Sequence, residues 1–288
     1  MSAYSVPAAP PPLLPKARPV SPLLLGGVLS VLAAGAYLGM LADLRVPTIA
    51  LATVAAVGIA ALISGLAGFA FSAICGAIVF QFRHDPVETV QIMLLCSLVN
   101  QMLCVWRLGS AIRLRAMLPF LMGGLIGVPA GAFLLLHLAP HDYLIGLGVL
   151  LSGYGLTMLV RPPLRIARQR RLWDAMSGFA GGVMGGFAAT PGAPVAIWCG
   201  TKGWDKMAQR AVVQPYIVVV QIAGLVSIAL LHPPGMPHPG VPALAWLCVP
   251  LGLLGTWWGF TLGRTITDRQ FGRLVNALLI VSGLGLLA

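Results

Sequence analysis

Long apolar runs separated by short polar stretches fill almost the whole chain after residue 20. They lie near 22–41, 46–82, 89–106, 116–138, 143–160, 175–201, 209–231, 243–263 and 270–288. About 20 consecutive apolar residues suffice for a helix to cross a bilayer, so the pattern predicts a series of membrane helices. The predicted fold class is an all-α polytopic membrane protein.

Two of these runs have lengths that fit neither one upright crossing nor two. The run 46–82 holds 37 residues without a charged side chain, and the run 175–201 holds 27. The second run contains the sequence TPGAP at 190–194, which is typical of one helix ending and another beginning. Each run is therefore either one long broken crossing or a re-entrant hairpin that enters and leaves on the same side.

The distribution of lysine and arginine favours the hairpins. With two hairpins and a cytoplasmic Arg-rich loop at 161–174, sixteen of the 18 basic residues fall on the cytoplasmic side, and only Arg45 and Arg83 lie outside. If each broken run crossed once, the count would be nine against nine. Because basic residues accumulate in cytoplasmic loops, we expect hairpins, a cytoplasmic N-terminus and a periplasmic or external C-terminus.

Four short similarities recur in the same order in the two halves of the chain. The matched pairs are GFAFS (68–72) with GFAAT (186–190), VNQ (99–101) with VVQ (219–221), the GLxGxxxG rows at 124–131 and 252–259, and SGxGL at 152–156 and 282–286. A hairpin followed by three spans crosses an odd number of times, so we expect the second half to be inverted. Inverted repeats with paired interrupted segments are typical of secondary transporters, whose site lies where the interruptions meet.

The repeat predicts how the chain is divided. We expect a disordered, Pro- and Ala-rich cytoplasmic tail, one additional transmembrane helix, a first repeat, a basic cytoplasmic loop and a second, inverted repeat, at 1–20, 21–42, 43–160, 161–174 and 175–288 respectively. Asp85 and Asp205 each follow a broken run, where we expect them to cap the next helix.

Composition narrows the class of function. Hydrophobic residues make up 58% of the chain and charged residues 9%, against about 25% charged residues in soluble proteins. The basic residues lie between apolar runs, so they indicate membrane orientation and not nucleic-acid binding. The five cysteines show no C-x-x-C pairing, and no His or Asp lies deep within an apolar run. We therefore expect no enzyme, no metal and no cofactor.

The layout resembles the sulfite exporter TauE/SafE family over about residues 47–288. Each half opens with a Gly-rich broken segment, followed by a polar link, a span, a basic loop and a small-residue helix. The family's first motif is usually a run of consecutive glycines, whereas this chain has GFAFS at 68–72; the second half has Gly185-Gly186 and then TPG at 190–192. The resemblance implies a multi-pass protein of the cell (inner) membrane that moves sulfite, organosulfonates or related sulfur or carboxylate anions.

The helix breaks offer a way to hold an anion without a buried cation. A helix that begins at membrane depth presents unpaired N–H groups and its positive dipole end. Thr190 would cap one such helix, with Pro191 in its first turn and free N–H groups at 192, 193, 195 and 196; Ser72 would cap another over 72–82.

Neutral amides inside the spans would complete this site, because they are expensive in hydrocarbon and must face the bundle interior. The predicted substrate-binding residues are Gly68, Phe69, Ala70, Phe71, Ser72, Asn100, Gln101, Thr190, Pro191, Gly192, Ala193, Gln214 and Gln221. The alternatives are helix kinking for the breaks and hydrogen bonding between helices for the amides.

These features predict a secondary transporter that exports a small sulfur-containing anion such as sulfite or an organosulfonate. A negative cell interior drives anions outward, so export requires no embedded acidic residue for coupling. An anion channel and a carboxylate-anion transporter of the same fold stay open as alternatives. The expected partners are a small anion and the lipid bilayer, with no nucleic acid; a homo-oligomer also stays open.

Overall fold

A computed structural model describes residues 20–67, 71–80, 85–160, 171–234 and 240–262, with four single positions beyond them. These ranges fold into helices and contain no strand. The helices are α1 (Val20–Asp43), α2 (Thr48–Ala67), α3 (Phe71–Val79), α4 (Pro86–Leu108), the 3-10 turn η1 (Gly109–Ala111), α5 (Leu114–His137), α6 (Pro140–Val160), α7 (Arg171–Ala188), α8 (Gly192–Thr201), α9 (Lys206–Leu231) and α10 (Ala243–Leu262).

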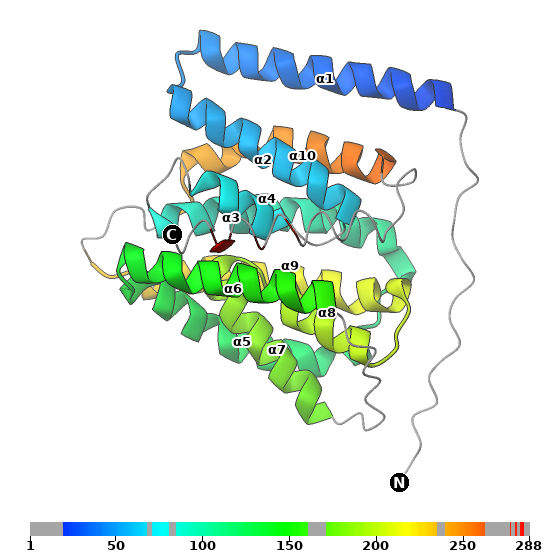
Figure 1. Cartoon of the computed structure of the whole chain (residues 1–288), viewed down its shortest axis with the longest axis vertical. Helices are drawn as coiled ribbons and strands as arrows, with labels where there is room; N and C mark the ends of the chain where they lie inside the picture. The colour runs from blue at the N-terminus through cyan, green and yellow to red at the C-terminus, as the bar shows by residue number, and fades with distance from the viewer. Residues whose placement is uncertain are drawn as a thin grey trace.

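The helices lie across the molecule in layers (Figure 1). Helix α1 forms one edge beside α2 and α10, α5 and α7 form the opposite edge, and α4 and α9 lie between. Four described helices are long and apolar enough to span a membrane, over 48–65, 86–106, 114–137 and 207–231. The prediction of an all-helical polytopic membrane protein agrees with this architecture.

Several sequence predictions fall outside the described residues. These are the tail up to residue 19, most of the basic loop, and nearly all of the run 270–288. Helix α7 begins at Arg171, so the last four residues of the predicted basic loop are helical.

The second broken run reverses direction between α7 and α8. Helix α7 ends at Ala188, and the next residue, Ala189, has a left-handed φ of 54° that turns the chain out of the helix. The Ala189 and Thr190 N–H groups donate to Gly185 and Met184 carbonyls at 3.0 and 3.3 Å, which satisfies them locally. Since Asp174 near the start of α7 contacts Lys202 just beyond α8, both open ends of the run lie together. The run is therefore a hairpin.

The first broken run divides into α2 and α3, which contact each other. Its interruption, at 68–70, lies outside the described residues. Helix α3 begins at Phe71 and ends at Val79, so Ser72 is its second residue and not the cap that the sequence predicts.

Helices α4 and α9 pack antiparallel at the centre of the molecule. Gln221 of α9 donates a hydrogen bond to Ser97 of α4. Gly224, one turn further along α9, lies against Leu94, which precedes Ser97 by one turn on α4. This register places Ile217 opposite Gln101. The two helices follow the two broken runs, so residues next to both runs meet along this contact.

The two glycine rows are packing faces. A Cβ on Gly127 or Gly131 of α5 would collide with the backbone of α7 at Phe179 and Val183. A Cβ on Gly255 of α10 would likewise collide with the backbone of α2. Residue numbers rise together along both contacts, so α5 runs parallel to α7, and α10 to α2. Each small-residue helix thus packs on the broken run of the other half, so the glycine rows have a structural role.

Candidate functional site

Capping aspartates begin the two central helices. Asp85 Oδ1 accepts hydrogen bonds from the Val87 and Glu88 N–H groups at 2.9 and 3.2 Å. Asp205 Oδ1 accepts one from the Ala208 N–H at 2.6 Å. The predicted capping role of both residues is confirmed. Gln101 follows Asp85 by the same number of residues as Gln221 follows Asp205. Each glutamine therefore lies at the same distance from the start of its own helix.

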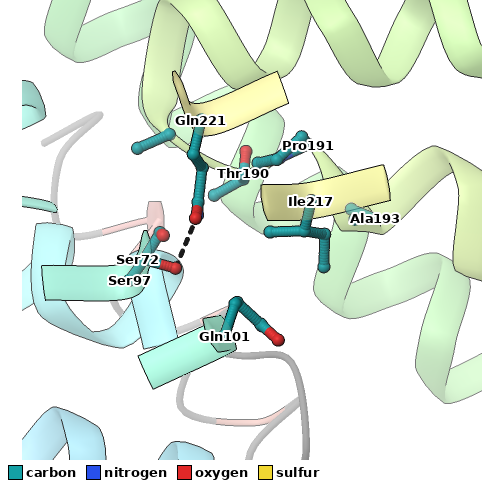
Figure 2. A pocket seen from close by; sticks show the side chains of 10 residues that line it. Ser72, Ser97, Gln101, Thr190, Pro191, Ala193, Ile217 and Gln221 are labelled. Atoms are coloured by element: carbon teal, nitrogen blue, oxygen red, sulfur yellow. Dashed lines mark hydrogen bonds between the residues drawn. The ribbon is translucent and has the colours of Figure 1, made fainter. Parts of the chain in front are cut away.

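A cavity lies where the α7–α8 hairpin turns beside these helices (Figure 2). It is small in this structure, because the volume open to the centre of a water-sized sphere is about 20 Å³, enough for an ordered water molecule. Its lining residues are Ser72, Ser97, Gln101, Ala189, Thr190, Pro191, Gly192, Ala193, Ile217 and Gln221. None of these ten side chains carries a charge.

One hydrogen bond crosses the cavity wall, and several polar atoms do not pair. Gln221 Nε2 donates to Ser97 Oγ at 2.6 Å (Figure 2). Gln101 Oε1, Gln221 Oε1 and the Thr190 hydroxyl are buried without a hydrogen-bond partner among the described residues. Buried polar groups are nearly always paired in a folded protein, so these atoms mark a place where a ligand or water belongs.

Backbone donors at the start of α8 complete the cavity. The helix begins at Gly192 after Pro191, which has helical angles and no N–H to offer. The first helical N–H groups, on Gly192 and Ala193, have no carbonyl four residues back within the helix. Pro194 has no N–H, and Val195 is the first residue placed to bond within the helix. The cavity is thus lined by neutral donors of backbone and side chain.

A sequence model of the family described as sulfite exporter TauE/SafE matches residues 53–286. The chain belongs to this family. No curated protein and no solved structure matched the chain. The matched range begins within α2 and includes most of the first broken run, the whole second run and both central helices. The resemblance predicted from the sequence is confirmed, and membership makes this a membrane transport protein.

Seven residues predicted from the sequence line the cavity of this TauE/SafE protein: Ser72, Gln101, Thr190, Pro191, Gly192, Ala193 and Gln221. Gly68, Phe69 and Ala70 lie outside the described residues. Phe71 packs in the hydrophobic core. Asn100 and Gln214 are buried elsewhere. Asn100 lies near Gly252 of α10, because consecutive helical residues point in different directions.

Two details of the predicted donors need correction in this TauE/SafE protein. Thr190 does not cap α8, because its hydroxyl makes no hydrogen bond within the described chain. Val195 and Ala196 are not free donors, because a helix that begins at Gly192 places their N–H groups within its own hydrogen-bond ladder.

The sequence prediction also missed Ser97, Ala189 and Ile217. Ser97 had a signal, since it precedes Gln101 by one helical turn and shares its face. Ile217 stands in the same relation to Gln221, but a hydrophobic residue in a membrane helix signals nothing by itself. No feature of the sequence signals Ala189, whose place in the turn follows only from its left-handed backbone conformation.

Proposed function

We propose that this protein is a secondary transporter that exports a small sulfur-containing anion, such as sulfite or an organosulfonate, across the cytoplasmic membrane. The observation that carries the proposal is the uncharged cavity at the α7–α8 turn. Backbone and side-chain donors converge there, and Gln221 stands well inside α9, far from either end. Membership of the sulfite exporter family supports the choice of a sulfur anion.

The cavity can bind an anion through neutral groups alone. The α8 start offers the Gly192 and Ala193 N–H groups and the positive end of its dipole, and α3 begins one residue before Ser72. Hydrogen bonds to a charged group contribute about 1.5–3 kcal/mol each, so three or four contribute about 5–12 kcal/mol before the costs of association are subtracted. An uncharged cavity also releases its ligand more readily than one that holds a buried ion pair, as a transporter requires.

The relative directions of the helices support an inverted repeat. Helices α4 and α9 hold corresponding places in the two halves and run antiparallel, while α5 is parallel to α7 and α10 to α2. If successive helices alternate in direction, these relations hold together only when the second half is inverted. Alternating access then follows from the two halves rocking about the central cavity.

Charge distribution supports an orientation in which the second hairpin opens to the cytoplasm. Arg171 at the start of α7 and Lys202 after α8 lie at its open end, and further arginines precede Arg171 in the sequence. A potential of 100 mV, negative inside, favours the exit of one negative charge by about 2.3 kcal/mol. This drives export without a coupled ion.

Counterflow in liposomes tests the proposal. Vesicles that contain the purified protein and are loaded with unlabelled sulfite receive a trace of labelled sulfite outside. A carrier accumulates label transiently above its equilibrium level, whereas a channel only equilibrates it. Flux of acetate or malonate with none of sulfite or methanesulfonate would contradict the sulfur-anion proposal and favour the carboxylate transporter.

A further inference from the structure

We infer that the cavity selects a singly charged oxyanion and rejects the doubly charged form of the same size. This inference rests on the proposed function and names the ionisation state of its substrate: hydrogen sulfite or a sulfonate, not the sulfite dianion or sulfate. Three properties of the described cavity lead to it: the positive potential available, the absence of a charged lining residue, and unfilled acceptors.

The two helix N-termini at the cavity together act like about one positive elementary charge. A helix N-terminus is equivalent to roughly half a positive charge. Helix α8 begins in the cavity wall at Gly192, and α3 begins beside it, with its second residue, Ser72, in the lining. Two such ends match one negative charge and leave a second one uncompensated.

None of the described side chains that line the cavity adds a full charge to the two helix N-termini. The buried cation on the same hairpin, Lys202, is committed elsewhere, because its Nζ lies 2.5 Å from Asp174 Oδ1 beyond the far end of α8. Three aromatic rings, of Phe120, Trp198 and Trp204, surround that ammonium group within about 6 Å of their centres. The work of removing an ion from water grows with the square of its charge, so a dianion loses about four times as much solvation as a monoanion.

The unpaired side-chain oxygens of Gln101 and Gln221 also disfavour a dianion. Gln101 and Gln221 are 6% and 0% exposed, and the side-chain oxygen of each is unpartnered in the described structure. An amide that turns its NH₂ group to an anion keeps its carbonyl oxygen close to the same ligand. That oxygen repels a second negative charge and is satisfied by an O–H or N–H group on the ligand. Hydrogen sulfite can supply such a group and methanesulfonate cannot, but neither monoanion brings a second negative charge to these oxygens.

The test compares three anions of similar size on the purified protein by titration calorimetry. Sulfite changes from monoanion to dianion near neutral pH, methanesulfonate is a monoanion throughout, and sulfate is a dianion throughout. We expect the apparent Kd of total sulfite to rise about tenfold per pH unit above its second ionisation. The Kd of methanesulfonate should change by less than about twofold, which shows that the protein itself does not titrate, and sulfate should bind at least about a hundredfold more weakly.

A gain-of-charge variant sharpens the comparison. Ile217→Lys places an ammonium group in the cavity wall, and the ratio of methanesulfonate to sulfate affinity should then fall by about tenfold or more. The wild-type titrations decide the matter even if this variant does not fold. Sulfate binding as tightly as methanesulfonate, or sulfite affinity that is constant or increases with pH, would overturn the charge selection alone. Failure of sulfite and methanesulfonate to bind at any pH would overturn the proposed function together with it.

Discussion

Gln221 on α9 donates a 2.6 Å hydrogen bond to Ser97 on α4, whereas Gln101, which holds the corresponding position on α4, lies opposite Ile217. The two glutamines follow their capping aspartates at the same spacing, but their side chains differ in their partners. One glutamine is tied to the helix of the other half, and the side-chain oxygen of the other has no partner among the described residues. In the proposed site, Gln221 therefore also links the two helices, a role that Gln101 does not share.

Loss of the Ser97 hydroxyl should weaken the contact between the halves. Ser97→Ala leaves the buried Gln221 amide without its partner, so we expect the unfolding free energy to fall by about 1–3 kcal/mol. Thermal unfolding in detergent measures this as a lower Tm. The double variant Ser97→Ala/Gln221→Leu should lose less than the sum of the two single variants. Additive effects would contradict the importance of the bond.

Gln101→Leu should weaken anion binding. The change removes a neutral donor from the cavity at nearly constant volume, and a hydrogen bond to a charged ligand contributes about 1.5–3 kcal/mol, or roughly tenfold to hundredfold in Kd. Gln214→Leu is the matched control, because Gln214 is equally buried but does not line the cavity. Its Kd for methanesulfonate should stay within about twofold of wild type. Equal losses in both variants would place the site elsewhere.

Asp174 and Lys202 should stabilise the second hairpin as a pair. The two side chains are only 12% and 4% exposed, and Asp174 also accepts a 2.6 Å hydrogen bond from Trp198 Nε1. Asp174→Asn or Lys202→Met leaves one buried charge unpaired, at a cost of about 3–5 kcal/mol. The double variant Asp174→Asn/Lys202→Met should recover much of the lost Tm. Single variants that melt like wild type would show that the pair does not hold the hairpin closed.

The left-handed backbone at the hairpin turn predicts a stabilising substitution. Ala189 has a φ of 54°, which glycine adopts without strain, so Ala189→Gly should raise stability by about 0.5–1 kcal/mol. The neighbouring Ala188 is helical and equally buried, and Ala188→Gly should lower stability by at least a similar amount. The difference in Tm between the two variants is the measurement. A lower Tm for Ala189→Gly would contradict the strain.

Labelling from outside the cell should establish the orientation. All five native cysteines are buried, so single cysteines at the exposed positions Leu44, His141, Arg115 and Arg171 can be read against a low background. A membrane-impermeant maleimide should label Leu44→Cys and His141→Cys in intact cells. Arg115→Cys and Arg171→Cys should react only after permeabilisation, because basic residues remain inside. The reverse pattern would invert the protein and the direction of access to the second hairpin.

Much of this architecture follows from local features of the sequence. The apolar runs, the TPGAP break, the capping aspartates and the glycine rows are each specified within a few residues, by hydrophobic transfer, missing N–H groups and backbone contact. The equal spacing of the glutamines from their caps is local too. These features suffice to predict the helices, the breaks and seven of the residues that line the cavity.

The tertiary structure alone decided which polar groups meet. The rotation of each helix about its axis is set by packing against neighbours, so Asn100 turns towards α10 while Gln101 on the next position lines the cavity. Ser97 and Ile217 gained their importance only when α4 and α9 paired antiparallel. Asp174 and Lys202 are distant in sequence and meet because α7 and α8 fold back on each other. Contacts between segments that are distant in the sequence depend on how all the helices pack together. A short stretch of sequence does not determine that packing.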